Sequence, residues 1–572
     1  MGFGEMVKSA ASKSLVIKIN LTFLAVFLIV YLALLLQPPP LYEKINGNSA
    51  VHCSLRECIM KKVEDRMMKK MAGGEKRKGK AIPAIFNKSV HGDHPMRIGI
   101  VNMGPEEEFD WGSIGEAVAV EFEHVSGNLE WKDLFPEWID EEEENEGTSC
   151  PEIPMPDLSS AEELDVVVAR IPCRQPESGW NRDVFRLQAH LVAARLAARR
   201  GRRDGSGKVR VAVKSECRPM MEIFRCDDVV GREGEWWMFE VDGERLEEKM
   251  ELPVGSCMLS MPLWQKGNNE AYDLSKFGDR QVASAKKEAY ATVLHSSDLY
   301  VCGAIVLAQS ILKSGSTRDL ILLHDASIPQ PKLLALSAAG WKLRMITRIR
   351  NPRAEKNSYN EYNYSKLRLW QLTDYHKLIF IDADIIVLRN LDILFSFPQI
   401  TAVGNDGVIF NSGIMVIEPS NCTFKTLMKR RYDVISYNGG DQGFLNEVFV
   451  WWHRLPRRVN FLKNFWSNDT AEAVVKNSLF GADPPQLYAI HYLGLKPWVC
   501  HKQYDCNWNI GEKRVYASDI AHQRWWKVHD DMDEGLKGFC GLSKERKESL
   551  ESERKGAEEL DIGDGHWRIK ID

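Results

Sequence analysis

Two carboxylates stand one residue apart at the end of a predicted buried strand. The mostly apolar run 377–381 leads directly into Asp382, Ala383 and Asp384, and residues 385–388 are apolar again. Carboxylates in such a turn can converge on one hard cation, and oxygen ligands favour Mn²⁺ or Mg²⁺. Without a cation their desolvation would be costly. We therefore interpret the triplet as a metal site rather than as two surface aspartates, with the cation neutralising a diphosphate leaving group.

Small polar residues follow later in the same region. Asn411, Ser412 and Gly413 lie between the apolar pair 409–410 and a predicted strand at 414–417. Their size would let them contact a sugar without crowding it. The sequence thus places hydrogen-bonding groups near a second strand.

A glycine-rich segment, 438–443, opens a predicted helix that continues from Phe444. Gly440 permits close approach of the backbone, and Asp441 and Gln442 offer a carboxylate and an amide to sugar hydroxyls. A helix start with an aspartate at the positive end of the dipole explains the segment equally well.

The segment 491–498 (HYLGLKPW) closes this block. His491 offers a nitrogen ligand to the same metal, and Lys496 a positive charge to a diphosphate. A lone histidine is more often structural than a ligand, but Gly494 and Lys496 beside it favour a role in the site.

Alternating strands and helices must position these groups. Strands are predicted at 289–294 and 320–323, and helices at 301–313 and 331–339. This repetition predicts a parallel sheet, whose ligands bind at the carboxyl ends of the strands. The polar turn 295–298 lies at one such end.

Residues 97–262 are predicted to form a smaller, preceding α/β region. Strands are expected at 98–101, 164–169 and 209–213, with a helix near 183–200. No group of residues there suggests chemistry. An accessory domain, a dimer surface and an acceptor platform remain open.

The N-terminus predicts a membrane anchor. An almost unbroken apolar run, 21–36, follows three lysines and precedes three prolines, and a bilayer needs roughly 20 apolar residues. We expect a cytosolic tail (1–18), a transmembrane signal anchor (19–36) and a stem (37–96) in a single-pass type II protein. A buried core helix is the less favoured alternative. Residues 511–572 are expected to be a C-terminal tail, with a solvated helix or disordered end after Leu542.

The length and composition of the chain limit which classes of function are possible. The 572 residues suffice for two or three domains, and 75 Lys and Arg against 80 Asp and Glu give a net charge of -5, which argues against a nucleic-acid partner. Among the 12 cysteines, Cys217 with Cys226 and Cys500 with Cys506 are close enough to pair, although free thiols are as plausible.

Together these motifs resemble glycosyltransferase family 8, which includes glycogenin and has a GT-A type nucleotide-diphospho-sugar transferase fold. The resemblance covers roughly residues 286–500, within an expected GT-A catalytic domain at 286–510, and implies a Mn²⁺-dependent enzyme with a UDP-sugar donor. It places Leu294, Ser296 and Tyr300 against uridine. Lys366 would face the phosphates or sugar, and Gly494 and Lys496 the diphosphate. Asp382, Asp384 and His491 would ligate Mn²⁺, with Ala383 between them. The sugar would contact Asn411, Ser412, Gly413, Asn438, Gly440, Asp441 and Gln442. Asn438 replaces an aspartate of glycogenin, so a carboxylate role there is lost.

The anchor and the long preceding region resemble the plant branch that substitutes xylan. This resemblance implies retaining transfer of glucuronic acid from UDP-glucuronate to xylan in an α-1,2 linkage, in the Golgi membrane, within a possible transferase complex. Asp441 would be the catalytic carboxylate. Arg368, Lys366 and Arg389 are the candidates to meet the sugar carboxylate.

Two alternatives remain. A glycogenin-like enzyme would prime its own chain from UDP-glucose on a mobile tyrosine, for which Tyr504 and Tyr516 are available. A non-catalytic Golgi scaffold would not need the metal ligands, all of which are present.

Overall fold

A computed structural model describes residues 95–571, apart from 140, 142–149, 160–161, 178, 261–286, 406–408, 466–469 and 562–564. The predicted cytosolic tail and membrane anchor, and nearly all of the predicted stem, lie outside the described residues. Within the part that is described, every helix is too short or too polar to span a bilayer.

The N-terminal α/β unit contains a six-stranded sheet in the order β2-β1-β3-β4-β6-β5. The first four strands in this order are parallel, and β6 and β5 add an antiparallel hairpin. The predicted strands and helix of this region are present. Its elements are β1 (Met96–Val101), α3 (Pro105–Gly112), β2 (Gly115–Val120), α4 (Trp131–Leu134), β3 (Val166–Arg170), α5 (Val184–Arg200), β4 (Lys208–Lys214), β5 (Val229–Glu233), β6 (Trp236–Asp242) and α6 (Gly243–Met250).

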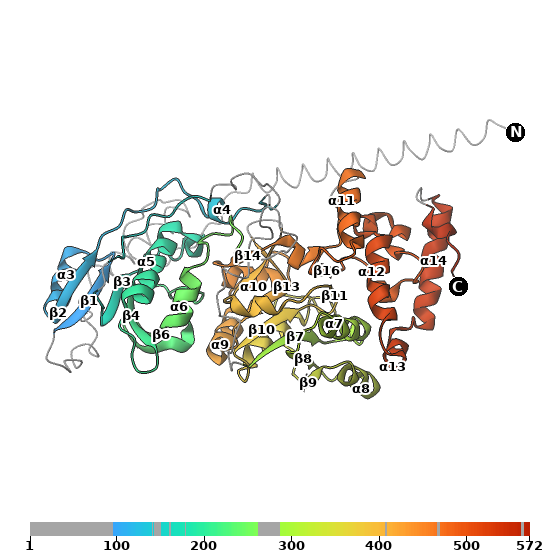
Figure 1. The fold of residues 1–572 in the computed structure, drawn as a ribbon, viewed down its shortest axis with the longest axis horizontal. Coiled ribbons are helices and arrows are strands. Elements are labelled where there is room, and N and C mark those ends of the chain that lie inside the picture. Colours follow the sequence, from blue (N-terminus) through green and yellow to red (C-terminus); the bar gives the residue numbers. More distant parts are fainter. Residues whose placement is uncertain are drawn as a thin grey trace, which may run out of the picture. The chain divides into compact units, whose positions relative to one another are not determined.

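The second α/β unit contains a seven-stranded sheet in the order β14-β12-β13-β10-β7-β8-β9 (Figure 1). Its strands are β7 (Glu288–Leu294), β8 (Asp319–His324), β9 (Lys342–Met345), β10 (Lys377–Ile381), β12 (Thr401–Gly404), β13 (Phe410–Ile417) and β14 (His453–Leu455). The α/β class is confirmed, but the sheet is mixed rather than parallel, because β13 runs antiparallel to both β10 and β12. A short connection from β12 to β13 allows only this antiparallel return.

Three further strands, β11 (Ile385–Val387), β15 (Phe461–Leu462) and β16 (Ala489–His491), form a small sheet in the order β11-β16-β15. The helices of this unit are α7 (Val301–Lys313), α8 (Gln330–Ala338), α9 (Asn421–Arg430), α10 (Asp441–Val448) and α11 (Thr470–Gly481). A 3₁₀ segment, Asn363–Gln371, precedes β10.

The C-terminal segment is folded against this unit. It contains α12 (Asp519–Asp530), α13 (Glu534–Lys537) and α14 (Lys544–Glu559). A disulfide joins Cys302 on α7 to Cys540, and the buried Trp525 packs against Trp498. The helix after Leu542 is largely exposed, as predicted, but its Leu550 and Ala557 are buried.

Buried polar contacts join the two α/β units. The Arg225 guanidinium lies 2.9 Å from the Glu418 carboxylate, and Lys249 Nζ donates to the Gln399 carbonyl at 2.8 Å. Cys226 forms a disulfide with Cys422. These contacts fix the N-terminal unit beside β12 and β13, the strands that border the site described next.

The order of the central strands creates a crevice. From β7 the chain continues outward to β8 and β9, and then returns to β10 on the other side of β7. Ligands of such sheets bind at the carboxyl ends of the strands where this reversal occurs. The predicted metal triplet directly follows β10, so it lies at this point.

Candidate active site

Two strand pairings bring the predicted metal ligands together. Asp382 and Asp384 flank the turn between β10 and β11, and the pairing of β11 with β16 sets Ile385 opposite His491. On the other side, the Asp382 N–H donates to the Gly413 carbonyl at 2.9 Å. Ligand atoms of the two carboxylates and the imidazole lie within 4.8 Å of one another. Three segments far apart in sequence thus converge on one point.

A glycine allows the histidine to approach β13. A Cβ built on Gly413 would lie only 2.6 Å from His491 Cε1, closer than any side chain tolerates. Contrary to the prediction, Gly413 does not precede the strand: Asn411, Ser412 and Gly413 lie within β13 and are buried. Two of their backbone N–H groups are bonded to side chains instead of to the neighbouring strand: that of Ser412 to Gln442 Oε1 and that of Gly413 to Asn411 Oδ1.

A chain of asparagines fixes the orientation of the imidazole. The Gly413 N–H donates to Asn411 Oδ1 at 2.8 Å, which identifies that atom as an acceptor. Asn460 Nδ2 donates to the same oxygen at 2.9 Å, so its own Oδ1 faces His491 Nδ1, 3.2 Å away. His491 must therefore donate from Nδ1, so that Nε2, 3.4 Å from Asp384 Oδ1, is the nitrogen available to a cation bound between them. Asn460 was not predicted from the sequence.

The two carboxylates are electrostatically different. Burial raises the pKa of Asp382 to about 6. The neighbouring carboxylates of Asp384 and Asp441 also raise this pKa, and the Lys366 ammonium lowers it. Burial also acts on Asp384, but Lys496 and His491 hold its pKa well below the usual range. The positive groups near Asp382 thus do not fully compensate the charge of its carboxylate. Two carboxylates and an imidazole suit a divalent cation such as Mn²⁺, whose charge would supply it.

Two lysines flank the carboxylates. Lys366 Nζ lies 2.5 Å from Asp441 Oδ2 and 3.3 Å from Asp382 Oδ1, and Lys496 Nζ lies 2.7 Å from Asp384 Oδ2. Burial lowers the pKa of each lysine, but the neighbouring carboxylates more than offset it and raise that pKa above the usual value. Both side chains are therefore cations fixed beside the candidate metal site.

The predicted sugar-binding residues form a second group. Ser412 Oγ donates to Asp441 Oδ2 at 3.2 Å, and the Ser412 N–H donates to Gln442 Oε1 at 3.1 Å. Asn438 has a different environment: its Oδ1 accepts from the Gly440 and Gly443 N–H groups and so holds the turn before α10. The helix begins at Asp441, earlier than predicted.

A cleft of about 630 Å³ opens beside these residues. Its lining includes eight of the predicted positions: Leu294, Ser296, Tyr300, Lys366, Asp382, Ala383, Asp384 and Asp441. Arg348 also lines it, with its guanidinium 3.1 Å from Asp325, and was not predicted. Arg368 and Arg389 do not line the cleft; they lie over the rings of Phe424 and Tyr488. Of the three proposed partners of a sugar carboxylate, only Lys366 is placed to act.

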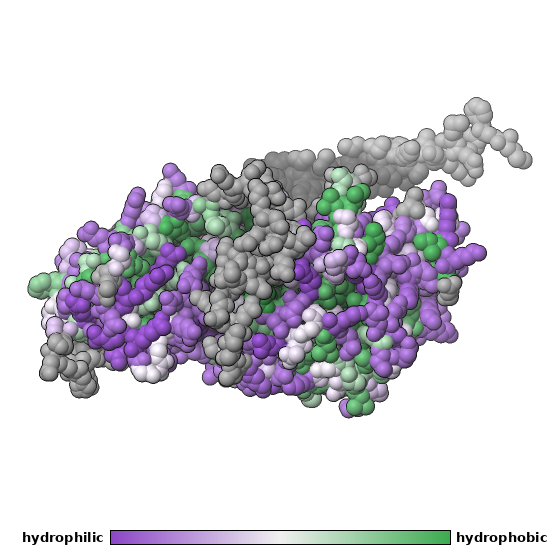
Figure 2. All heavy atoms as spheres, viewed as in Figure 1, coloured by the Kyte–Doolittle hydropathy of each residue, from purple (hydrophilic) through white to green (hydrophobic). Residues whose placement is uncertain are grey.

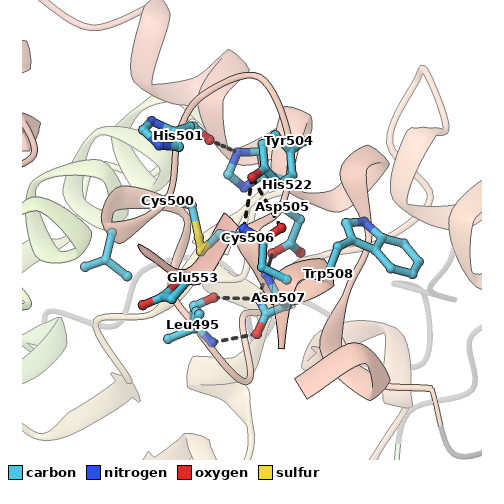
Figure 3. The surroundings of a disulfide bond; sticks show 12 residues. Leu495, Cys500, His501, Tyr504, Asp505, Cys506, Asn507, Trp508, His522 and Glu553 are labelled. Atoms are coloured by element: carbon cyan, nitrogen blue, oxygen red, sulfur yellow. Dashed lines mark hydrogen bonds between the residues drawn. A yellow bond between two sulfur atoms is a disulfide. The ribbon is translucent and has the colours of Figure 1, made fainter. Parts of the chain in front are cut away.

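Figure 3 shows how the loop before Lys496 is held. The Asn507 side chain accepts from the Leu495 N–H at 2.9 Å and donates to the Leu495 carbonyl at 3.0 Å. Asp505 accepts from Asn507 and forms a buried ion pair with Lys463 at 2.5 Å. Gly494 has a φ of +74°, and a Cβ there would lie 2.5 Å from Asn507 Oδ1. Tight packing thus sets the position of Lys496.

The disulfides correct one prediction and confirm another. Cys500 pairs with Cys506, as predicted (Figure 3). Cys217 does not pair with Cys226; it pairs with Cys173, and Cys226 pairs with Cys422. The β-strands and helices between residues 173 and 422 bring these distant cysteines together, and sequence spacing carries no signal of that.

Comparisons with known proteins agree with this geometry. A model described as Glycosyl transferase family 8 matches residues 291–403, and one described as GUX1-5 N-terminal domain matches residues 71–257. The chain is 54% identical over 579 residues to UDP-glucuronate:xylan alpha-glucuronosyltransferase 2 of Arabidopsis thaliana, covering 99% of this chain and 97% of that protein.

A second relative is UDP-glucuronate:xylan alpha-glucuronosyltransferase 1 of Arabidopsis thaliana, 48% identical over 485 residues that cover 83% of this chain and 71% of that protein. Among solved structures, the chain is similar to the galactosyltransferase LgtC in complex with donor and acceptor sugar analogs. That match has 16% identity and a TM-score of 0.30, and it covers 44% of this chain and 99% of that one.

Proposed function

We propose that this chain, which belongs to glycosyl transferase family 8 and has a mixed α/β catalytic unit, transfers glucuronic acid from UDP-glucuronate to xylan. The observation that carries the proposal is the cluster of Asp382, Asp384 and His491 between Lys366 and Lys496. A departing diphosphate requires concentrated positive charge, which the two lysines and a cation held by this cluster would supply. The choice of donor and acceptor is supported by the names of relatives 54% and 48% identical to the chain.

Asp382, Asp384 and His491 would hold the cation, for which Mn²⁺ is our choice. When bound, it would supply Lewis-acid stabilisation of the leaving UDP. The chain contributes the rest: Asn460 keeps His491 in the ligating tautomer, and Lys496 adds a second positive charge next to Asp384. The cleft beyond Asp384, with Leu294, Ser296 and Tyr300 at its edge, has room for the nucleoside.

In the transfer, the bond between sugar C1 and the β-phosphate oxygen breaks, and a bond forms between C1 and an acceptor hydroxyl oxygen. The hydroxyl proton passes to the departing phosphate. We propose that the α configuration is retained, with Asp441 stabilising the positive charge that develops at C1. Lys366 Nζ lies 2.5 Å from Asp441 Oδ2 and so holds this side chain in place. Inversion would instead need a general base opposite the leaving group.

Lys366 is our candidate for recognition of the glucuronate carboxylate. It lines the cleft and lies between Asp382 and Asp441. A cation bound to Asp382 would take over that carboxylate's charge, and Lys366 would then be available to a carboxylate on the sugar. A donor without this carboxylate, such as UDP-glucose, would leave the buried ammonium less well compensated.

The structure disfavours one form of the self-priming alternative. Tyr504 is fully buried and bonded to Asn509, so it is not an acceptor on a mobile segment. Tyr516 packs beside Gly494. The intact cluster of metal ligands likewise argues against a scaffold without catalysis.

For the setting, we keep the sequence-based proposal of a single-pass type II protein of the Golgi membrane with a lumenal catalytic unit. The disulfides within the described chain support an oxidising compartment such as the secretory lumen. Association with other transferases in a complex is part of the same proposal.

The proposed donor is tested by supplying UDP-glucuronate, UDP-glucose, UDP-galacturonate and UDP-xylose separately, with Mn²⁺ and xylohexaose. We expect transfer from UDP-glucuronate at a rate well above the others, and loss of transfer in Asp382→Ala. Transfer from UDP-glucose without any acceptor would instead support self-priming. Absence of transfer from every donor would overturn the assignment.

A further inference from the structure

A second, larger groove of about 1,020 Å³ lies behind asparagine side chains that border the candidate metal site. Four segments line it: residues 137–139 and 141 of the N-terminal unit, residues 403–405 at the end of β12, residues between 454 and 464, and α11. The mechanism described above uses none of its exposed side chains. Because the N-terminal unit supplies one wall, the groove exists only in the complete chain.

The groove shares a wall with the predicted sugar-binding residues. Asn405 lines the groove and accepts from Asn411 Nδ2 at 3.1 Å. Asn460 also lines it, and the other edge of its amide orients His491. The groove therefore lies one layer of asparagine side chains from the candidate metal site, and an extended acceptor chain bound along it has to pass only this layer to bring a neighbouring sugar to the donor.

The charged side chains that line the groove are balanced: three are acidic (Glu137, Glu141 and Glu472) and three are basic (Arg454, Arg457 and Lys476). Arg454 donates to the Ser256 and Pro136 carbonyls, and Lys476 pairs with Glu472 at 2.6 Å. Glu141 accepts from the Arg457 N–H at 2.8 Å. The groove thus offers hydrogen-bonding groups without a surplus of either charge. This suits an uncharged polar chain better than a nucleotide, a phosphorylated lipid or an acidic peptide.

An aromatic platform stands in this groove. Trp138 follows α4 and is 65% exposed, although an indole of this size is normally buried. Val475 on α11 lines the groove and is also exposed, and Figure 2 shows hydrophobic side chains on the surface over α11. The face of an indole packs against the apolar C–H face of a pyranose ring, while the ring hydroxyls bond to surrounding amides and carboxylates.

We propose that this groove is the acceptor site, that it binds an uncharged oligosaccharide chain, and that Trp138 is the platform on which one sugar ring stacks. The inference rests on the proposed function for its acceptor role. It assigns a purpose to the N-terminal α/β unit: that unit completes the acceptor site of the catalytic unit. The disulfide between Cys226 and Cys422 and the pair of Arg225 with Glu418 then serve to hold the two walls in register.

The test compares the full-length chain with Trp138→Ala, Trp138→Phe and, as a matched control, Phe109→Ala. Phe109 is 78% exposed on α3, at the end of the N-terminal unit away from α4 (Figure 1). With UDP-glucuronate fixed, we expect Trp138→Ala to raise the KM for xylohexaose roughly tenfold, the loss of one aromatic contact. Trp138→Phe should restore most of the affinity. The KM for the donor and its slow hydrolysis without acceptor should not change. An unchanged KM for xylohexaose in Trp138→Ala would overturn the proposal.

Binding without donor separates this inference from the proposed function. Titration of xylo-, cello- and manno-hexaose into the same variants reports the groove even if no glucuronic acid is transferred. In one outcome the wild type binds one neutral hexaose, and Trp138→Ala binds it more weakly, without any transfer of glucuronic acid. That result would refute the xylan assignment and still support the groove as an oligosaccharide site. Equal binding by wild type and Trp138→Ala, or no binding of any hexaose, would refute the groove.

Discussion

The side chain of Asn507 holds both backbone groups of Leu495, accepting from its N–H at 2.9 Å and donating to its carbonyl at 3.0 Å. Lys496, the next residue, contacts Asp384 at 2.7 Å. A residue beyond the recognisable motif thus fixes a positive charge beside Asp384, one of the candidate metal ligands.

We therefore expect Asn507→Ala to weaken binding of UDP by roughly tenfold, because loss of about 1.4 kcal/mol from a misplaced lysine corresponds to that factor. The measurement is calorimetric titration of UDP with Mn²⁺. Asn509→Ala is the matched control, since Asn509 is in the same 3₁₀ segment and bonds to Tyr504 instead of the loop. Equal affinities in the two variants would contradict a positioning role for Asn507.

The orientation of His491 gives a second prediction. Replacing Asn460 by Ala removes the acceptor for His491 Nδ1–H, and outer partners of this kind change metal affinity by about 10–100-fold. We expect Asn460→Ala to bind Mn²⁺ more weakly by that order, and Asn460→Asp, which keeps an acceptor, to retain more of it. Electron paramagnetic resonance of free Mn²⁺ reports this without any assay of activity. Wild-type affinity in Asn460→Ala would refute the argument.

Metal binding should weaken at acid pH. Because burial raises the pKa of Asp382 to about 6, this ligand binds a proton below that pH and must lose it to bind a cation. One unit below this pKa, we expect the apparent Mn²⁺ affinity to fall roughly tenfold from its plateau. In Asp382→Asn the affinity should be low throughout and depend less on pH. A wild-type affinity that is constant between pH 5 and pH 7 would contradict the electrostatic account.

The contact between the two α/β units should lose stability when Glu418 is replaced. Burial raises the pKa of Glu418, but Arg225 and Lys249 outweigh it and hold that pKa far below the usual range. A depressed pKa contributes stability above the unfolded value of about 4.3, which is lost as the pH falls below it. Glu418→Gln removes the buried carboxylate 2.9 Å from Arg225, and we expect the free energy of unfolding to fall by about 3 kcal/mol or more.

Thermal unfolding measures that loss at pH 7, where Glu418→Gln should have a clearly lower Tm than the wild type. Near pH 3 the difference should shrink. Glu548→Gln, which alters an exposed pair on α14, is the control and should leave the Tm unchanged. Equal Tm values for Glu418→Gln and wild type at pH 7 would show that the pair does not stabilise the contact between the two units.

The sequence predicts the candidate metal ligands better than the residues that position them. Asp382 and Asp384 stand out because an apolar strand precedes them, and His491 because Gly494 and Lys496 follow it. Asn460 has no such signal: it lies alone, 31 residues before His491, and gains its role only when β15 pairs with β16. Long-range pairing of short strands leaves no periodic pattern in a sequence.

The mixed sheet and the proposed acceptor groove could not be predicted from the sequence, for related reasons. An apolar strand reads the same whether it runs parallel or antiparallel, so the direction of β13 was not predictable from its residues. Trp138 is one tryptophan of 17, and its exposure follows from tertiary packing. The region around it had suggested an acceptor platform only as one of three possibilities, and the groove now gives that possibility a physical basis.

The most direct test of the account is a proton NMR time course of the full-length chain with UDP-glucuronate, Mn²⁺ and xylohexaose. The account predicts a new anomeric proton of an α-linked glucuronosyl residue, formed as the donor's α-anomeric signal disappears, and its absence with Asp384→Asn. A β-linked product would contradict retention. The loss of the donor signal without any glycosidic product, or no loss at all, would contradict glucuronosyl transfer to xylan.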